Sequence, residues 1–113
     1  RLVGEAKALD LLLSARIFKG DEAESLGLVN KSISAAELEN FVNNYAKHMA
    51  ERVSPRSMTI MKRQIRAGYS QTFSKSLEIA DKEMFLSFEQ DDFKEGVESF
   101  VENRAPKFKG IGT

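Results

Sequence analysis

Helix start and stop signals follow one another along nearly the whole chain, each accompanied by apolar residues at helical spacing. Ser34 opens a capping-box pattern that Glu37 completes three residues later. Ser54 precedes Pro55, a pair suited to the N-cap and the first helical position because proline lacks an N–H that this position leaves unpaired. Gly27 suits the left-handed position that ends a helix. This succession predicts an all-α chain.

We predict about six helices of varied length, separated by short connections. In order, they are residues 4–15, a short helix capped by Asp21 and closed by Gly27, a helix from Ser34, a helix from Ser54-Pro55, residues 72–90, and a last helix capped by Asp92 and stopped by Pro106. Residues 28–33 could form one brief extended segment, but a lone strand makes no sheet. Residues 107–113 form a tail with Gly110 and Gly112.

The helix expected at residues 72–90 is apolar on more than one side. Its main stripe is Phe73, Leu77, Ala80, Met84 and Phe88. Ile79 and Leu86 lie on the opposite side, and such a helix needs more than one partner. If Ile79 and Leu86 are exposed, the chain lacks the body they cover, whereas their burial would favour a self-sufficient bundle.

Composition limits the class of protein. The chain has 113 residues, enough for one small domain over residues 1–113, and 42% of them are apolar. Seventeen basic residues balance seventeen acidic ones, unlike the basic, clustered charge of most nucleic-acid binders. There is no cysteine, and no apolar run approaches the length of a membrane span. We expect a cytoplasmic or mitochondrial-matrix protein with no nucleic-acid or membrane partner.

Reactive constellations are scarce in this sequence. The single histidine, His48, lies at the edge of an apolar stripe, where a structural role is the ordinary interpretation because a general base also needs a positioned partner. Asp91 and Asp92 suit helix capping better than acid–base chemistry. The methionines occupy positions that predict core packing. We therefore assign no catalytic and no metal-binding residue.

The order of the motifs resembles the enoyl-CoA hydratase/isomerase (crotonase) family over essentially the whole chain. In the first half, the similar residues are Gly4, Ala8, Leu9, 12–18, 21–23 and 26–30. Ser54-Pro55 and Lys62 follow at the spacing of the family. The last part is similar at residues 91–92, 95–97, Phe100, 104–106 and 108–110.

The resemblance implies a crotonase-like fold whose subunit is considerably longer than this chain. Its N-terminal part, a β-spiral of short strands and helices, would supply two backbone N–H groups to the thioester oxygen, and a pair of glutamates to activate water. These groups would lie before Arg1, so we expect a C-terminal fragment that is inactive alone. The implied substrate is a coenzyme A thioester, most simply a 2-enoyl-CoA, with no covalently bound cofactor.

The resemblance also implies roles for the C-terminal helices. They would cover the active site and form the interface of a homotrimer, often stacked as a dimer of trimers. Met84 and Phe100 match positions near the acyl tail, although plain core packing explains them equally well. Asn103 stands where several hydratases have a lysine that pairs with a CoA phosphate, and Arg104 or Lys107 could replace that charge.

Two alternatives stay open at this level. The basic tail at residues 103–109 is either a solvated chain end or a phosphate contact. The whole chain is either part of an acyl-CoA enzyme, which the ordered motifs favour, or a stand-alone helical module for protein interaction.

Overall fold

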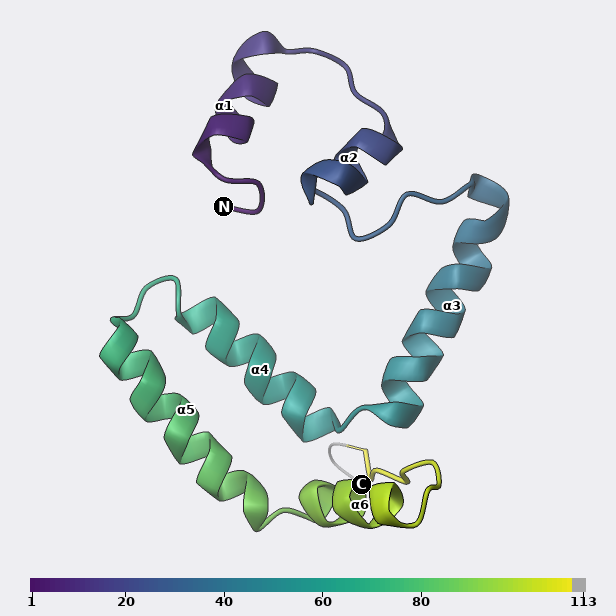
Figure 1. Ribbon diagram of the computed structural model, residues 1–113, viewed down its shortest axis with the longest axis vertical. Coiled ribbons are helices and arrows are strands. Elements are labelled where there is room, and N and C mark those ends of the chain that lie inside the picture. The colour runs from purple at the N-terminus through teal and green to yellow at the C-terminus, as the bar shows by residue number, and fades with distance from the viewer. Residues whose placement is uncertain (111–113) are drawn as a thin grey trace. The chain divides into compact units, whose positions relative to one another are not determined.

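Helices form nearly all of the regular structure. The computed structural model describes residues 1–110, and residues 111–113 of the predicted tail lie outside them. The helices are α1 (Glu5–Ser14), α2 (Gly20–Leu26), α3 (Ala35–Arg52), α4 (Pro55–Ala67), α5 (Phe73–Phe88) and α6 (Asp91–Val101) (Figure 1). No strand occurs among the described residues, residues 28–33 included. The predicted all-α class with six helices is confirmed.

The chain divides into two compact units, Arg1–Val42 and Asn43–Thr113, with the boundary inside α3. We describe each unit by itself. The prediction of one helical region over residues 1–113 remains a prediction.

In the first unit, Arg16 joins α1 to α2. Its guanidinium donates to Asp10 of α1 at 3.4 Å and to Glu22 of α2 at 2.6 Å. The same group lies 5.8 Å from the ring centre of Phe18, within cation–π range. The hydrogen bond to Glu22 is the main cause that raises the pKa of Arg16. A polar contact thus connects two helices that bury almost nothing apolar.

The end of α2 is a Schellman motif, as the position of Gly27 predicts. Gly27 has φ 79°, its N–H donates to the Glu24 carbonyl, and the Leu28 N–H donates to the Ala23 carbonyl. Ala23 is the one buried apolar residue among those described. The predicted start is wrong: Gly20 opens the helix after the N-cap Lys19, which makes no side-chain cap.

The capping-box pattern before α3 is satisfied in a different way from the usual one. The Ser34 hydroxyl donates to the Glu37 carboxylate at 2.6 Å, while the Ser34 carbonyl accepts the Glu37 N–H at 3.0 Å. The predicted apolar stripe of the helix is exposed at every member: Leu38, Phe41, Val42, Tyr45 and Met49. The stripe therefore presents apolar surface to solvent along the helix.

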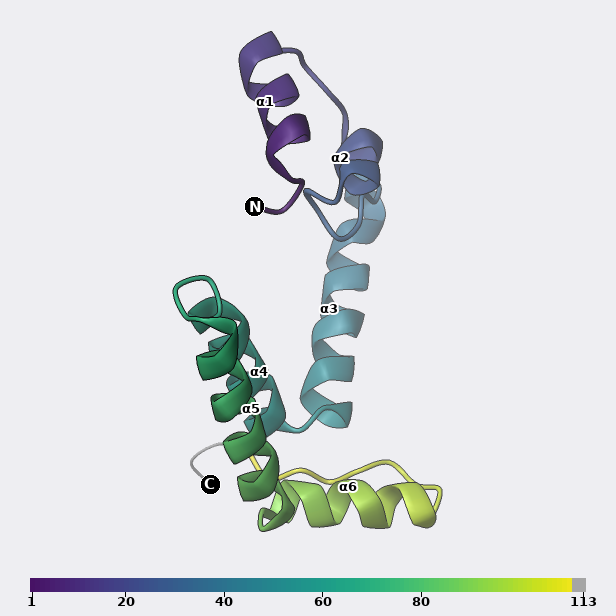
Figure 2. The ribbon, with the colours of Figure 1, turned by 60° about the vertical axis from the view of Figure 1, so that its left-hand side comes forward.

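In the second unit, α4 and α5 run side by side in opposite directions, and α6 contacts the end of α5 (Figures 1 and 2). The short connection between α4 and α5 leaves room only for an antiparallel pair. Ser54 caps α4, since its hydroxyl accepts the Ser57 N–H at 3.0 Å, and Pro55 follows as predicted. Thr72 caps α5 in the same way through the Lys75 N–H at 3.2 Å.

The predicted cap of the last helix is wrong. Helix α6 begins at Asp91 after Gln90, so Asp92 is already inside its first turn. The Asp92 carboxylate instead accepts a hydrogen bond from the Ser54 hydroxyl and one from the Arg56 N–H at 3.3 Å. A residue expected to serve its own helix therefore binds the start of α4.

Apolar surface remains exposed throughout. The chain exposes 9286 Å², whereas a compact monomer of 12.7 kDa exposes about 6,200 Å². The excess, about 3,000 Å², is larger than the roughly 600–1,500 Å² that an interface between two parts of one chain typically buries. Leu86 is exposed and Ile79 half-buried, and three of the predicted core methionines, Met49, Met61 and Met84, are exposed. Among the described residues, neither unit has a hydrophobic core of its own.

We predict that the isolated chain self-associates, because exposed apolar side chains of this number are stable in water only when covered. Sedimentation velocity over a wide concentration range should show a mass that rises with concentration. A strictly monomeric species at the highest concentration would contradict the prediction.

We predict that Ser54→Ala lowers the free energy of unfolding by about 0.5–2 kcal/mol, because it removes the cap of α4. The same change leaves the Asp92 carboxylate without a hydroxyl donor. Urea denaturation followed by circular dichroism measures the loss. Ser74→Ala, at an exposed serine of α5, is the matched control and should change stability by less than about 0.5 kcal/mol. Equal losses of stability in the two variants would contradict the assignment of Ser54 as the cap of α4.

Candidate functional site

A cavity of about 510 Å³ lies in the second unit where α4, α5 and α6 meet. One part of its lining is apolar and comes from Phe93, Val97, Phe100 and Phe108. The other part is polar and comes from Ser54, Arg56, Ser57, Ser87, Gln90 and Asp92. A largely apolar hollow with a few polar groups on one side is typical of a ligand or partner site.

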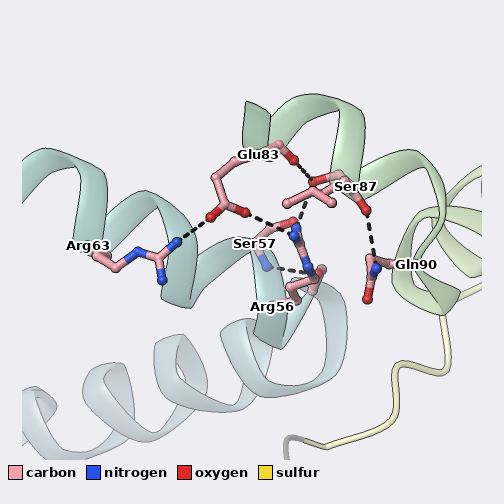
Figure 3. A network of polar contacts seen from close by, with 8 residues as sticks. Arg56, Ser57, Arg63, Glu83, Ser87 and Gln90 are labelled. Carbon is pink, nitrogen blue, oxygen red and sulfur yellow. Dashed lines mark hydrogen bonds and ion pairs between the residues drawn. The ribbon is translucent and has the colours of Figure 1, made fainter. Parts of the chain in front are cut away.

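An ion-pair network meets the polar side of the cavity through Arg56 and Ser87 (Figure 3). The Arg56 guanidinium donates to the Glu83 carboxylate at 3.0 Å and to the Ser87 hydroxyl at 2.7 Å. Arg63 binds the second oxygen of Glu83. Arg56 and Arg63 are two turns apart on α4 and so lie on the same face, where one carboxylate of α5 serves both. The network fixes the α4–α5 pair, and both Arg56 and Glu83 are only partly exposed to water.

Aromatic contacts join α5 to the first turn of α6. The rings of Phe88 and Phe93 are 5.1 Å apart at 69°, and those of Phe85 and Phe88 are 6.3 Å apart at 83°. Edge-to-face pairs of this kind add about 0.5–1.5 kcal/mol beyond the area they bury. They orient α6 so that Phe93 and Val97 line the cavity.

The chain reverses direction at Asn103, directly after α6. Asn103 has φ 52°, its N–H donates to the Phe100 carbonyl at 3.2 Å, and the Arg104 N–H donates to the Ser99 carbonyl at 3.0 Å. This is a second Schellman motif, and asparagine is one of the few residues that tolerate its left-handed position. The residues that follow, 104–110, run back along α6, and we call them the strap (Figure 2).

Glu95 of α6 holds the strap. Its two carboxylate oxygens accept from the two terminal nitrogens of Arg104, one of them at 3.0 Å, and one oxygen also accepts the Lys107 N–H at 2.6 Å. The Arg104 hydrogen bonds, followed by the Lys107 amide, lower the pKa of Glu95 to about 2. The same pairing, with a further bond to Glu102, raises the pKa of Arg104. Lys109 reaches Asp91 at 3.3 Å farther along the helix.

The structure places four of the five predicted contact residues at the end of α6 and on the strap. Phe100 lines the cavity and is 84% exposed, and Lys107 has an exposed side chain. Asn103 forms the turn, and Arg104 is bound to Glu95 and Glu102. Met84 lies on α5, half-exposed, and is not part of the cavity lining. The role of these five residues in ligand binding stays a prediction.

Sequence reasoning missed several residues that build the site. Glu95 and Arg104 both belong to the motifs quoted above, but a separation of nine residues predicts no contact without the turn at Asn103. Glu83 and Arg56 are 27 residues apart, and no local pattern links them. The one available signal was Asn103 itself, since an asparagine after a helix favours a left-handed end.

The described residues contain no group of histidine, cysteine, aspartate and glutamate side chains suited to a metal ion. Of the helices described, none combines the length and apolar character needed to cross a membrane.

Comparison with known proteins identifies the family. The sequence pattern of the family described as "Enoyl-CoA hydratase/isomerase" matches residues 1–111. The chain belongs to the enoyl-CoA hydratase/isomerase family. It is 38% identical, over 97% of its length, to a probable enoyl-CoA hydratase of Bacillus subtilis. It is 34% identical, over 88% of its length, to a short-chain-enoyl-CoA hydratase of Clostridioides difficile.

Solved structures of the family match the helices. A probable enoyl-CoA hydratase/isomerase from Mycobacterium abscessus matches with a TM-score of 0.88 at 25% identity, over 96% of this chain and 43% of that one. The enoyl-CoA hydratase of Bacillus anthracis matches with a TM-score of 0.86 at 26% identity, over 96% and 42%. The chain spans 43% of the Bacillus subtilis relative and 64% of the Clostridioides difficile one. It is the helical C-terminal region of a crotonase-like fold.

We predict that Glu95 titrates near pH 2 and that the strap is released by acid in the same range. Because the pKa of Glu95 is lowered from 4.5 in the folded chain, the stabilisation is fully present above about pH 4.5 and is lost as the pH falls toward 2. Carboxyl-carbon NMR measures the midpoint. Arg104→Ala should move the midpoint back toward 4.5, and an unchanged midpoint in this variant would contradict the assignment.

Proposed function

We propose that this chain is the helical cover and oligomerisation part of an acyl-CoA enzyme, most simply a 2-enoyl-CoA hydratase. The observation that carries the proposal is the apolar surface left uncovered on helices whose sequence belongs to the enoyl-CoA hydratase/isomerase family. Relatives with hydratase names extend well beyond the region matched by this chain, which leaves room in them for a body that such helices would cover.

Gly96 supports a close neighbour at the cavity. It lies inside α6, where glycine costs about 1 kcal/mol relative to alanine, yet its backbone is ordinary helix and an added Cβ would meet nothing within 4 Å. Neither the backbone conformation nor the local packing requires a glycine at this position. Another chain segment that passes close to the helix would explain it. Gly96 lines the cavity together with Phe100, so the covering segment would lie there.

The chemistry of hydration would come from the body and not from these helices. Water adds across the double bond of the enoyl thioester, with a proton to Cα and the hydroxyl to Cβ, and the charge that develops on the thioester oxygen needs fixed N–H donors. Glu83 and Glu95 are ion-paired within the chain. Asp92, the carboxylate in the cavity lining, already accepts hydrogen bonds from Ser54 and Arg56. The role left to the helices is to exclude water and to bind the acyl-CoA.

Within that role, Phe100 is placed to contact an acyl tail, since its ring is exposed at the cavity. Met84 could contribute from α5 only at a second surface, because it is not part of the cavity lining. For a CoA phosphate, Lys107 is the better candidate, because the Arg104 guanidinium is committed to two carboxylates. The assembly would be a homotrimer or a dimer of trimers.

We predict that the purified chain alone does not hydrate crotonyl-CoA, whereas the longer protein that contains it does. Loss of the enoyl-thioester absorbance measures the reaction. Turnover by the pure chain would disprove the assignment of the chemistry to the body, and an inactive longer protein would disprove the hydratase assignment.

We predict opposite effects of Gly96→Ala in the two forms. In the isolated chain it should stabilise α6 by about 1 kcal/mol, because alanine is the better helix former and the Cβ meets open space. In the longer protein it should weaken assembly or activity, because the methyl group meets the covering segment. Thermal unfolding, mass measurement and hydratase assays test both parts. A variant that stabilises both forms and keeps full activity would argue against a close neighbour at Gly96.

A further inference from the structure

The strap follows a defined path along α6. Three contacts fix the strap, and later strap residues contact earlier residues of α6. Arg104 and Lys107 reach Glu95, and Lys109 reaches Asp91 at the helix start. Ser99, the one buried polar residue among those described, supplies the carbonyl that binds the Arg104 N–H at the turn. The strap is therefore held at both ends and in its middle.

Glu95 is the centre of these contacts. Its side chain is 19% exposed, and that of Arg104 is 32% exposed, so water has limited access to the pair. The two parallel N–H···O bonds of an arginine fork define the direction of a carboxylate as well as its distance. The Lys107 amide then fixes the backbone of the strap to the same carboxylate. One side chain of α6 thus holds the strap at two points, Arg104 and Lys107.

The position of the strap decides what lies at the cavity. Phe108 is the only strap residue in the cavity lining, and it follows directly after the residue whose amide Glu95 binds. Phe108 is half-buried and shares the lining with the exposed Phe100. The exposed Lys107 side chain projects from the neighbouring position. If the strap moved away from α6, the cavity would lose the Phe108 side of its apolar lining and Lys107 would lose a fixed position.

We propose that Glu95 is a positioning residue which, through Arg104 and the Lys107 amide, holds the strap so that Phe108 completes the apolar lining of the cavity and Lys107, the preceding residue, keeps a fixed place. The link from this clamp to substrate rests on the proposed function, in which the cavity faces the acyl-CoA. Glu95 does not touch the substrate in this arrangement. Its removal therefore weakens binding and leaves the chemical step largely unchanged.

The experiment compares Glu95→Gln with Glu98→Gln. Glutamine keeps the size of the side chain but cannot form the charged fork with Arg104. Glu98 is an exposed carboxylate of the same helix and is the matched control. Hydrogen exchange of the Lys107 amide at neutral pH reports on the strap and needs no enzymatic activity. We expect exchange to become at least about tenfold faster in Glu95→Gln, because the strap opens locally while the helices persist, and to be unchanged in Glu98→Gln.

A second pair of measurements tests the substrate link in the longer protein. Glu95→Gln should raise the KM for an enoyl-CoA by about tenfold with kcat little changed, since misplaced binding groups act on binding before chemistry. Glu95→Asp, which keeps the charge on a shorter arm, should recover part of the loss. If Glu95→Gln perturbs the fold, Arg104→Lys keeps the charge, loses the fork and should give the same pattern.

The outcomes separate the two proposals. Unchanged exchange at Lys107 in both Glu95→Gln and Arg104→Lys would overturn the clamp, whatever the protein catalyses. Faster exchange with an unchanged KM would overturn the link between strap and substrate. Faster exchange in a longer protein without hydratase activity would retain the clamp and reject the proposed function instead.

Discussion

The lack of a buried core among the described residues is the constraint on which the rest of this structure depends. Six helices carry apolar stripes, yet among the described residues Ala23 alone is a buried apolar residue, and no large side chain is fully buried. Hydrophobic burial is ordinarily the dominant stabilising term of a domain. Here most of that stabilisation can arise only when another surface covers the helices. The exposed stripe of α3 and the exposed rings at the end of α6 follow from the same constraint.

Within the second unit, polar contacts define the geometry that burial does not. Glu83 joins two arginines of α4, Asp92 joins α6 to the capped start of α4, and Glu95 joins α6 to the strap. Charged pairs of this kind are directional, so they specify how elements meet even where they add little to stability. The second unit can thus present a prearranged surface to a partner. The aromatic pair of Phe88 and Phe93 adds an apolar contact at the same junction.

This arrangement suits a part of an enzyme that covers a site without performing the reaction. Membership of the enoyl-CoA hydratase/isomerase family and the likeness to solved structures establish the fold of these helices, and the covering role is the one proposed above. The cavity, the open space at Gly96 and the strap lie together on α6. A single helix therefore carries the surface proposed for covering and the device proposed for placing Lys107 and Phe108. Fold alone does not define a reaction, so the choice of hydration rests on the proposal and its assays.

The sequence by itself determined the helical class, the Ser54 cap, the left-handed end at Gly27 and the family, because these depend on interactions within about one helical turn or on ordered motifs. It did not determine where Asp92 acts, since a capping residue type also binds more distant donors when the fold brings them close. It also misplaced the start of α2, which begins at Gly20, before Asp21. The contacts of Glu83 with Arg56 and of Asp92 with Ser54 span 27 and 38 residues. Only tertiary structure decided them, because they require two helices to meet at a particular angle. The contact between Glu95 and Arg104 is an intermediate case. An asparagine after a helix favours a left-handed end, which the sequence shows at Asn103, but only the folded chain brings Arg104 back to Glu95.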